Sequence, residues 1–263
     1  MQVRIVYNLL KMPPKSTSPT KAAAPIPTLK VFGSFFAPEM RTVCALLDLN
    51  EIPYTCDTID LFTRAGQLEY QGYNPGEQMP TIIEGMNTIL ADPPHLYKYL
   101  CLTKDVDEKF YPTKDMNRDK KKVVDSYLEY IQWMVKRNSN RILKLKLQRS
   151  LIEKGLVDKD ELFDYSELEE QKEREIFFNI IIPNLETSLD GGKLYLCGFD
   201  FSIADIAFFN ELLNTIEIIE QNIDTRKYPN VDKWMRRIED IGPIRIATIK
   251  FQEELKRLKE MEK

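Results

Sequence analysis

The residues that most often do chemistry in proteins, cysteine and histidine, are sparse in this chain. Its four cysteines, Cys44, Cys56, Cys101 and Cys197, are scattered, without the close pairs of a zinc site or the density of a secreted disulfide scaffold. We therefore interpret all four as reduced thiols and expect no bound metal. The single histidine, His95, has no serine or cysteine partner at a spacing that indicates a catalytic triad.

The composition excludes several classes of function. Charged residues make up 30% of the 263 residues and the formal net charge is -4, so there is no concentrated basic surface of the kind that nucleic acids require. No run of about 18 apolar residues predicts a membrane span. We expect a protein that binds neither nucleic acid nor membrane and lies in the cytoplasm.

The first 28 residues differ from the rest. They carry Arg4, Lys11, Lys15 and Lys21 without an acidic residue, and they include a stretch rich in Pro, Ser, Thr and Ala. This composition predicts a flexible basic tail over residues 1–28. It also weakly resembles an organelle transit peptide, so import stays an alternative to the cytoplasmic location.

Residues 29–101 have the pattern of a compact α/β unit. Apolar residues alternate over 29–33 as in a half-buried strand, recur at helical spacing over 40–49, and are followed by a second predicted strand at 54–61. A strand, a helix and a strand are the smallest unit of a parallel sheet. A hairpin is predicted at 81–90 and a short helix near 95–100, whereas Arg64 and Gln67 fall in a predicted loop.

From residue 102 to residue 263 the pattern changes to long helices. Apolar residues recur at helical spacing over 123–135, and again over 176–189, where Pro183 interrupts the pattern. Residues 158–175 hold nine acids against three bases, which is typical of a solvated face or loop. We interpret this acidic run as an exposed insertion in an all-helical domain.

Three motifs stand at the junctions of these elements. The segment from Asn74 to Pro80 begins with a turn signal, Asn-Pro-Gly, and ends in a second proline. Ser202 and Asp205 have the spacing of a capping box at a helix start. Trp234, in the segment Tyr228–Pro229–Asn230–Val231–Asp232–Lys233–Trp234, is expected to pack between helices.

Together, these motifs and the order of elements resemble the glutathione S-transferase family over residues 29–252. Its theta-like group is suggested by the stretch at 110–130 and the long final helix. The resemblance implies an N-terminal thioredoxin-like domain at 29–101, a C-terminal helical glutathione-transferase domain, and a cis peptide before Pro80. It also implies a homodimer, because members of the family commonly pair.

The resemblance implies a specific chemistry as well. Members of the family activate the thiol of glutathione with a Ser or Tyr hydroxyl that lies just after the first strand. Counting back four residues from Arg41 places Ala37 at this position, and counting from the proline places Phe36 there; neither has a hydroxyl. Ser34 is the fallback, if the loop is shifted by two or three residues.

The contacts that the family makes to the γ-glutamyl end of glutathione are also altered in this sequence. The family usually holds the γ-glutamyl carboxylate with an acid–serine pair at a helix N-terminus, where this chain has Asp92 followed by Pro93. Pro93 has neither a hydroxyl nor an N–H. The resemblance leaves Gln78, Met79, Pro80 and Asp92 as glutathione-binding residues of a weakened site, with Arg64 or Gln67 as candidates for the glycine carboxylate.

Two functions follow from this sequence. The first is a non-catalytic, glutathione-transferase-like binding or scaffolding protein, a pseudoenzyme that serves as a subunit of a larger assembly. The alternative is an active theta-like transferase that conjugates glutathione to electrophiles, with Ser34 or a backbone amide replacing the missing hydroxyl.

Overall fold

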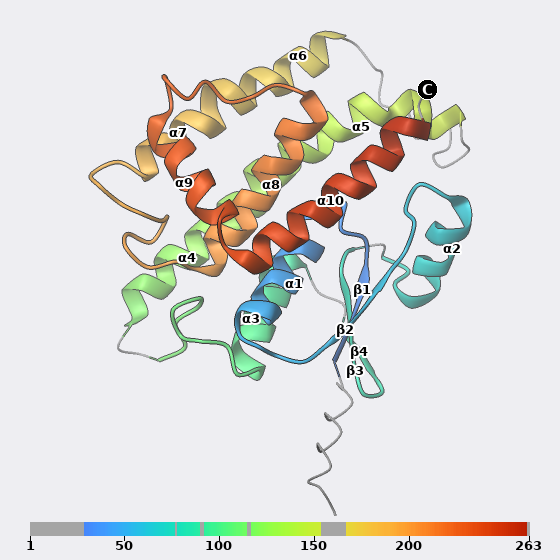
Figure 1. Ribbon diagram of the computed structural model, residues 1–263, viewed down its shortest axis with the longest axis horizontal. Helices are drawn as coiled ribbons and strands as arrows, with labels where there is room; N and C mark the ends of the chain where they lie inside the picture. The colour runs from blue at the N-terminus through green and yellow to red at the C-terminus, as the bar shows by residue number, and fades with distance from the viewer. Residues whose placement is uncertain (1–28, 77, 90–91, 115–116, 154–166, 262–263) are drawn as a thin grey trace, which may run out of the picture.

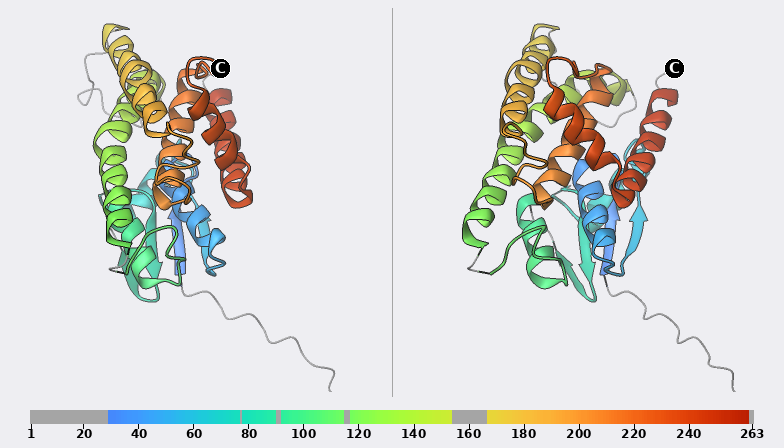
Figure 2. Two further views of the ribbon diagram at one scale, coloured as in Figure 1. Left: turned by 90° about the vertical axis from the view of Figure 1, so that its left-hand side faces the viewer. Right: turned by 60° about the vertical axis from the view of Figure 1, so that its left-hand side comes forward.

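The protein consists of a small α/β half followed by a larger helical half. The computed structural model describes residues 29–76, 78–89, 92–114, 117–153 and 167–261, so the predicted basic tail at 1–28 lies outside the described residues. Figure 1 shows the course of the chain, and Figure 2 shows the sheet with its helices at one end of the molecule and most of the helical half at the other. No described helix is long and apolar enough to span a membrane.

The α/β half is built on one mixed sheet. Its strands are β1 (Leu29–Gly33), β2 (Thr55–Thr58), β3 (Thr81–Glu84) and β4 (Asn87–Ile89), in the order β2-β1-β3-β4. Helix α1 (Pro38–Leu49) connects β1 to β2, which makes this pair parallel, and β3 and β4 form an antiparallel hairpin. The predicted strand–helix–strand unit and the predicted hairpin are therefore confirmed.

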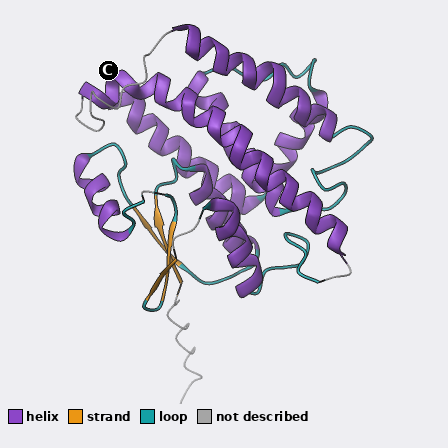
Figure 3. Cartoon of the chain, turned by 180° about the vertical axis from the view of Figure 1, so that it is seen from behind, coloured by secondary structure: helices purple, strands orange, loops and turns teal. Residues whose placement is uncertain are grey.

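Helices cover both faces of the sheet (Figure 3). Val31 belongs to the main core that also contains α1 and α3 (Pro93–Thr103), whereas its neighbour Phe32 packs against Tyr70 of α2 (Arg64–Tyr73) on the opposite face. The prediction of a loop around Arg64 and Gln67 is wrong, because this segment forms α2. Its start is stabilised by the Thr63 hydroxyl, which accepts a hydrogen bond from the Gly66 N–H at 3.2 Å.

Among the described residues, two long helical rods and three further helices make up the helical half. The first rod comprises α4 (Arg118–Tyr130), a π-helical segment (Ile131–Val135) and α5 (Lys136–Glu153); the second comprises α6 (Glu167–Ile176), a π-helical segment (Phe177–Ile181) and α7 (Ile182–Ser188). The remaining helices are α8 (Ile203–Ile219), α9 (Pro229–Glu239) and α10 (Gly242–Met261). Almost every residue of α8 is buried, so α8 is the central helix, and α10 returns across α1 (Figure 1).

The second rod differs from the sequence expectation in two ways. The described part of the acidic run forms α6 and not a loop. One of its acids, Glu173, is buried, where its carboxylate pairs with Arg141 at 2.9 Å and accepts a hydrogen bond from the Asn138 amide at 2.8 Å. Pro183, predicted to interrupt the helical pattern, is the second residue of α7, and the rod continues through it after the π-helical segment. A π-helical turn readily accommodates a local break in the hydrogen-bond ladder.

Candidate functional site

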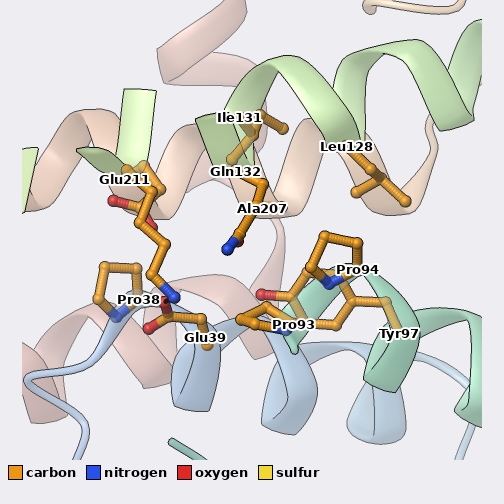
Figure 4. Close-up of a pocket in the computed structure, with 11 residues that line it drawn as sticks. Pro38, Glu39, Pro93, Pro94, Tyr97, Leu128, Ile131, Gln132, Ala207 and Glu211 are labelled. Atoms are coloured by element: carbon orange, nitrogen blue, oxygen red, sulfur yellow. Dashed lines mark ion pairs between the residues drawn. The ribbon is translucent and has the colours of Figure 1, made fainter. Parts of the chain in front are cut away.

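The N-termini of α1 and α3 open onto one narrow crevice between the two halves of the molecule. Figure 4 shows Pro38 at the start of α1 and Pro93 at the start of α3 on one side of this crevice, with Glu211 of α8 across from them. The free volume is about 10 Å³, which is room for about one water molecule. The remaining lining residues are Glu39, Pro94, Tyr97, Leu128, Ile131, Gln132, Lys136 and Ala207.

The loop from β1 to α1 carries the residues predicted to activate a thiol. Ala37 is the N-cap of α1, is half-buried, and has no side-chain oxygen. Phe36 is buried, with its ring packed edge-on against Phe62 at 5.1 Å between ring centroids and tilted against Phe251 at 5.8 Å. Neither residue presents a hydrogen-bond donor from its side chain.

Ser34, the fallback, uses its hydroxyl inside the protein. This fully buried hydroxyl donates to the Glu254 carboxylate of α10. The backbone N–H groups of Phe35 and Phe36 donate to the same carboxylate, at 3.2 Å and 2.8 Å. Glu254 therefore accepts three hydrogen bonds from this loop.

The carbonyl groups of the same loop are held by Arg41. Its guanidinium donates to the carbonyls of Phe35 and Phe36 at 2.6 Å and 3.0 Å, and to the backbone carbonyl of Asn210 at 2.9 Å. Complete burial lowers the pKa of Arg41 to about 10, and the Phe251 ring lies 4.1 Å from its central carbon. The loop is thus fixed through its N–H groups by α10 and through its carbonyls by Arg41 of α1, which is itself bonded to α8.

Two carboxyl side chains and one lysine line the crevice. Glu39 forms an ion pair with Lys136, and Glu211 lies fully buried nearby, where its carboxylate accepts a hydrogen bond from the Ser139 hydroxyl at 2.8 Å. Burial, with a further contribution from Glu39, raises the pKa of Glu211 to about 8. This cluster can retain a proton near neutral pH, which the sequence motifs do not indicate because its members come from α1, α5 and α8.

The loop before β3 has the predicted turn. The Met79–Pro80 peptide is cis, which confirms the expectation. The Gln78 carbonyl accepts hydrogen bonds from the Tyr70 hydroxyl at 2.6 Å and the Asn74 amide at 2.7 Å. The Gln78 side chain is exposed, Met79 is half-buried and Pro80 is buried. The backbone of this loop is therefore held by hydrogen bonds to the Gln78 carbonyl, whereas the Gln78 side chain lies at the surface.

The cis-proline loop and the β1–α1 loop lie together, as the predicted site requires. Phe32 and Thr81 are partners in the β1–β3 ladder, and a Cβ on Gly33 would lie 3.6 Å from the Cα of Pro80. Among the predicted ligand contacts, Asp92 is the exposed N-cap residue of α3, with no capping hydrogen bond from its side chain, and Pro93 is the first residue of that helix.

The remaining candidates have other surroundings. Arg64 is exposed in the first turn of α2, whereas the Gln67 amide donates to the Leu61 carbonyl at 3.2 Å. His95 is exposed on α3. No group of three or more His, Cys, Asp or Glu side chains among the described residues could hold a metal ion. Sequence reasoning missed Glu254, Lys136 and Glu211, whose roles depend on contacts between distant segments.

Comparison with known proteins shows which proteins share this fold. Residues 157–241 match the family model of the glutathione S-transferase C-terminal domain. This match spans the whole acidic run at 158–175. No curated protein matches the chain by sequence.

Several solved structures have the same fold. A human theta-2 glutathione transferase in complex with glutathione is 18% identical, with a TM-score of 0.72 over 88% of this chain and 91% of the other. Glutathione transferase E6 from Drosophila melanogaster is 24% identical, with a TM-score of 0.68 over 89% and 97%. A transferase homologue from Drosophila mojavensis with bound glutathione is 22% identical, with a TM-score of 0.69 over 89% and 97%.

These similar structures include both theta and epsilon transferases, so the fold alone does not single out the theta group. The predicted architecture, a thioredoxin-like domain followed by a helical domain, agrees with the observed one. The chain is therefore a protein of the glutathione-transferase fold whose C-terminal domain matches that family, and the resemblance predicted from its motifs is confirmed.

Proposed function

We propose that this protein is a binding or scaffolding member of the glutathione-transferase family that does not activate the glutathione thiol. One observation carries the proposal: the hydroxyl of Ser34 donates to the buried carboxylate of Glu254. Ser34 is the only hydroxyl residue between Gly33 and Pro38. A hydroxyl that already donates to a carboxylate has no second proton with which to stabilise a thiolate.

The helix N-termini support the same proposal. A helix N-terminus binds anions through free N–H groups, and proline has none. Pro38 and Pro93 take the first positions of α1 and α3, and Glu39 adds a carboxylate beside the crevice. Each lost hydrogen bond to a charged ligand group costs about 1–3 kcal/mol, so two losses weaken glutathione binding by about thirtyfold or more.

Residual glutathione binding belongs to this proposal. Two of the similar structures contain glutathione. The cis-proline turn at Met79–Pro80 and the exposed groups of Gln78 and Asp92 are the candidate contacts for a weakly bound ligand. We expect any such complex to lack transferase turnover.

The decisive experiment measures binding and chemistry separately. Isothermal titration with glutathione reports affinity, and an assay with a general aromatic electrophile reports turnover, with an active theta transferase as the positive control. We expect at most millimolar affinity and a rate equal to the uncatalysed reaction. Saturable turnover by the wild-type protein would overturn the proposal and support the alternative, an active theta-like transferase.

Replacement variants sharpen this test. Ala37→Ser restores a hydroxyl at the start of α1, and the Ala37→Ser/Pro93→Ser pair also restores a hydroxyl and an N–H at α3. We expect tighter glutathione binding in the double variant, by about tenfold or more. Ala37→Ser/Pro94→Ser is the matched control, because it changes the next proline of the same helix.

The proposed scaffolding role includes a homodimer or a larger assembly. The described surface exposes large apolar side chains at Trp133 and Phe199, each 74% exposed. Light scattering coupled to size exclusion measures the assembly state directly. A stoichiometric complex or dimer supports the role, whereas a monomer without co-purifying partners contradicts it.

A further inference from the structure

Cys44 and Cys56 lie in different elements but point to the same side of the sheet. Cys56 of β2 pairs in register with Val31, which belongs to the core beneath α1, whereas the next residue of β1, Phe32, packs on the opposite face. Because successive residues of a strand alternate between the two faces, Cys56 points towards α1. Cys44 of α1 lies in this same core and is only 2% exposed.

Tyr54 gives a second indication of the same arrangement. It lies two residues before Cys56 and packs against the core that contains Cys44. Burial, with further contributions from Cys44 and Asp48, which are one turn apart on α1, raises the pKa of its hydroxyl. The thiols of Cys44 and Cys56 also perturb each other, because each raises or lowers the pKa of the other. The two thiols therefore lie near each other on one side of the sheet, although twelve positions separate them in the chain.

We infer that Cys44 and Cys56 form a reversible dithiol–disulfide pair that reacts with low-molecular-weight disulfides. The thiolate of Cys56 attacks one sulfur of the small disulfide, which forms a mixed disulfide and releases one small thiolate. The Cys44 sulfur, after loss of its proton, then attacks the Cys56 sulfur and releases the second small thiol. Overall, the protein dithiol loses two electrons and two protons, and the small disulfide gains both.

The surroundings favour Cys56 as the attacking sulfur. It is half-buried on β2, the edge strand of the sheet, whereas Cys44 is buried. The neighbouring Cys44 thiol, with a further contribution from Lys250 of α10, lowers the pKa of Cys56. Burial instead raises the pKa of Cys101 to about 12 and of Cys197 to about 11. The thiolate, which is the reactive form, is thus concentrated at Cys56.

Intact-mass analysis of the full-length chain tests this pair. The reduced protein is incubated with oxidised glutathione and, separately, with bis(2-hydroxyethyl) disulfide, a probe that lacks the tripeptide. With both probes we expect the mass to fall by two hydrogen atoms and the number of titratable thiols to fall from four to two. Peptide mapping is expected to show one cross-link, between the segments that contain Cys44 and Cys56.

Single variants separate the two steps. In Cys44→Ala, the second step is blocked, so a mixed disulfide with the probe accumulates on Cys56. In Cys56→Ser, we expect at least a tenfold slower reaction with either probe. Cys197→Ser is the matched control, because Cys197 is also half-buried, and it should react like the wild-type protein.

Three results would overturn the inference. The first is a wild-type protein that keeps four thiols under these conditions. The second is a wild-type mixed disulfide that does not resolve, and the third is a cross-link that involves Cys101 or Cys197. Because the hydroxyethyl probe does not need a glutathione site, the outcome is independent of the proposed function.

Discussion

Two buried carboxylates, Asp205 and Glu254, organise two different turns of this protein. Asp205 accepts hydrogen bonds from the N–H and hydroxyl of Ser202, at 2.9 Å and 2.8 Å, three residues away in the chain. Glu254 accepts from the Ser34 hydroxyl and from two backbone N–H groups, but it lies 220 residues from Ser34. In both turns a carboxylate accepts hydrogen bonds from a serine hydroxyl and from backbone N–H groups. The serine and the carboxylate are close in the sequence in the first turn and far apart in the sequence in the second.

The difference determines what each carboxylate stabilises. Asp205 also accepts from the Leu196 N–H and the Trp234 indole N–H, so it joins the start of α8 to α9 inside the helical half. Glu254 joins α10 to the β1–α1 loop and thereby links the helical half to the α/β half. Asp205 stabilises one domain, whereas Glu254 fixes the loop where a family member would bind the thiol.

Removal of the Asp205 carboxylate is expected to have the largest effect on stability. Asp205→Ala leaves buried donors of Ser202, Leu196 and Trp234 without their acceptor, at about 1–3 kcal/mol each, so we expect a loss of about 3–5 kcal/mol. Urea denaturation measures this loss. Asp200→Ala removes a carboxylate that is 64% exposed and should change stability by less than about 0.5 kcal/mol. Equal effects of both substitutions would contradict the assigned role of Asp205.

Sequence reasoning predicted the Asp205 turn but not the Glu254 turn, and the distances along the chain explain why. The spacing of Ser202 and Asp205 is a local pattern, and the turn before Pro80 is likewise specified by neighbouring residues. Glu254 lies beside the exposed Glu253 in a charged helix, so no local signal marks it as buried. Lys136 and Glu211 acquire their roles in the same way, through packing of α8 against α1 and α5.

Loss of the Glu254 carboxylate should have the next largest effect. Glu254→Ala removes the acceptor of the Phe35 N–H and the Ser34 hydroxyl, but the Phe36 N–H keeps the Ser34 Oγ at 3.1 Å. We therefore expect a smaller loss than for Asp205, about 2–3 kcal/mol. Hydrogen exchange should show faster exchange of the Phe35 and Phe36 amides. Glu253→Ala is the matched control and should leave the exchange of these amides unchanged. Unchanged exchange in Glu254→Ala would contradict the proposed role of the Glu254 carboxylate in holding the β1–α1 loop.

A third buried acid, Glu211, differs from Asp205 and Glu254 in its hydrogen bonds. Its carboxylate accepts from the Ser139 hydroxyl, and within the described part of the chain it is bonded through this side chain and not through backbone N–H groups. Its pKa is raised from 4.5 to about 8, mainly by burial, so the folded protein keeps a proton that the unfolded chain has lost. Stability should therefore fall as the pH rises from about 4.5 to about 8. The side chain in Glu211→Gln is neutral at every pH. The decrease in the free energy of unfolding over this pH range should therefore be smaller in Glu211→Gln than in the wild-type protein, by about 1–2 kcal/mol.

Urea denaturation of Glu211→Gln and of the wild-type protein at pH 5 and pH 8 measures this pH dependence. Glu217→Gln is the control, because Glu217 is half-buried on the same helix. Parallel pH profiles for the wild-type and Glu211→Gln proteins would show that Glu211 keeps the same charge in the folded and unfolded states.

The smallest expected effect belongs to Ser34→Ala, which also separates the two functional hypotheses. The substitution removes one buried hydrogen bond to Glu254 and leaves the two backbone donors in place, so we expect a loss of about 0.5–1.5 kcal/mol. If the hydroxyl serves only this contact, glutathione binding and the rate with an electrophile stay at the wild-type values. If it activates a thiol, Ser34→Ala abolishes turnover while Ser34→Thr, which keeps a hydroxyl, retains part of it. Stability and turnover, measured on the same two variants, therefore distinguish a structural Ser34 from a catalytic one.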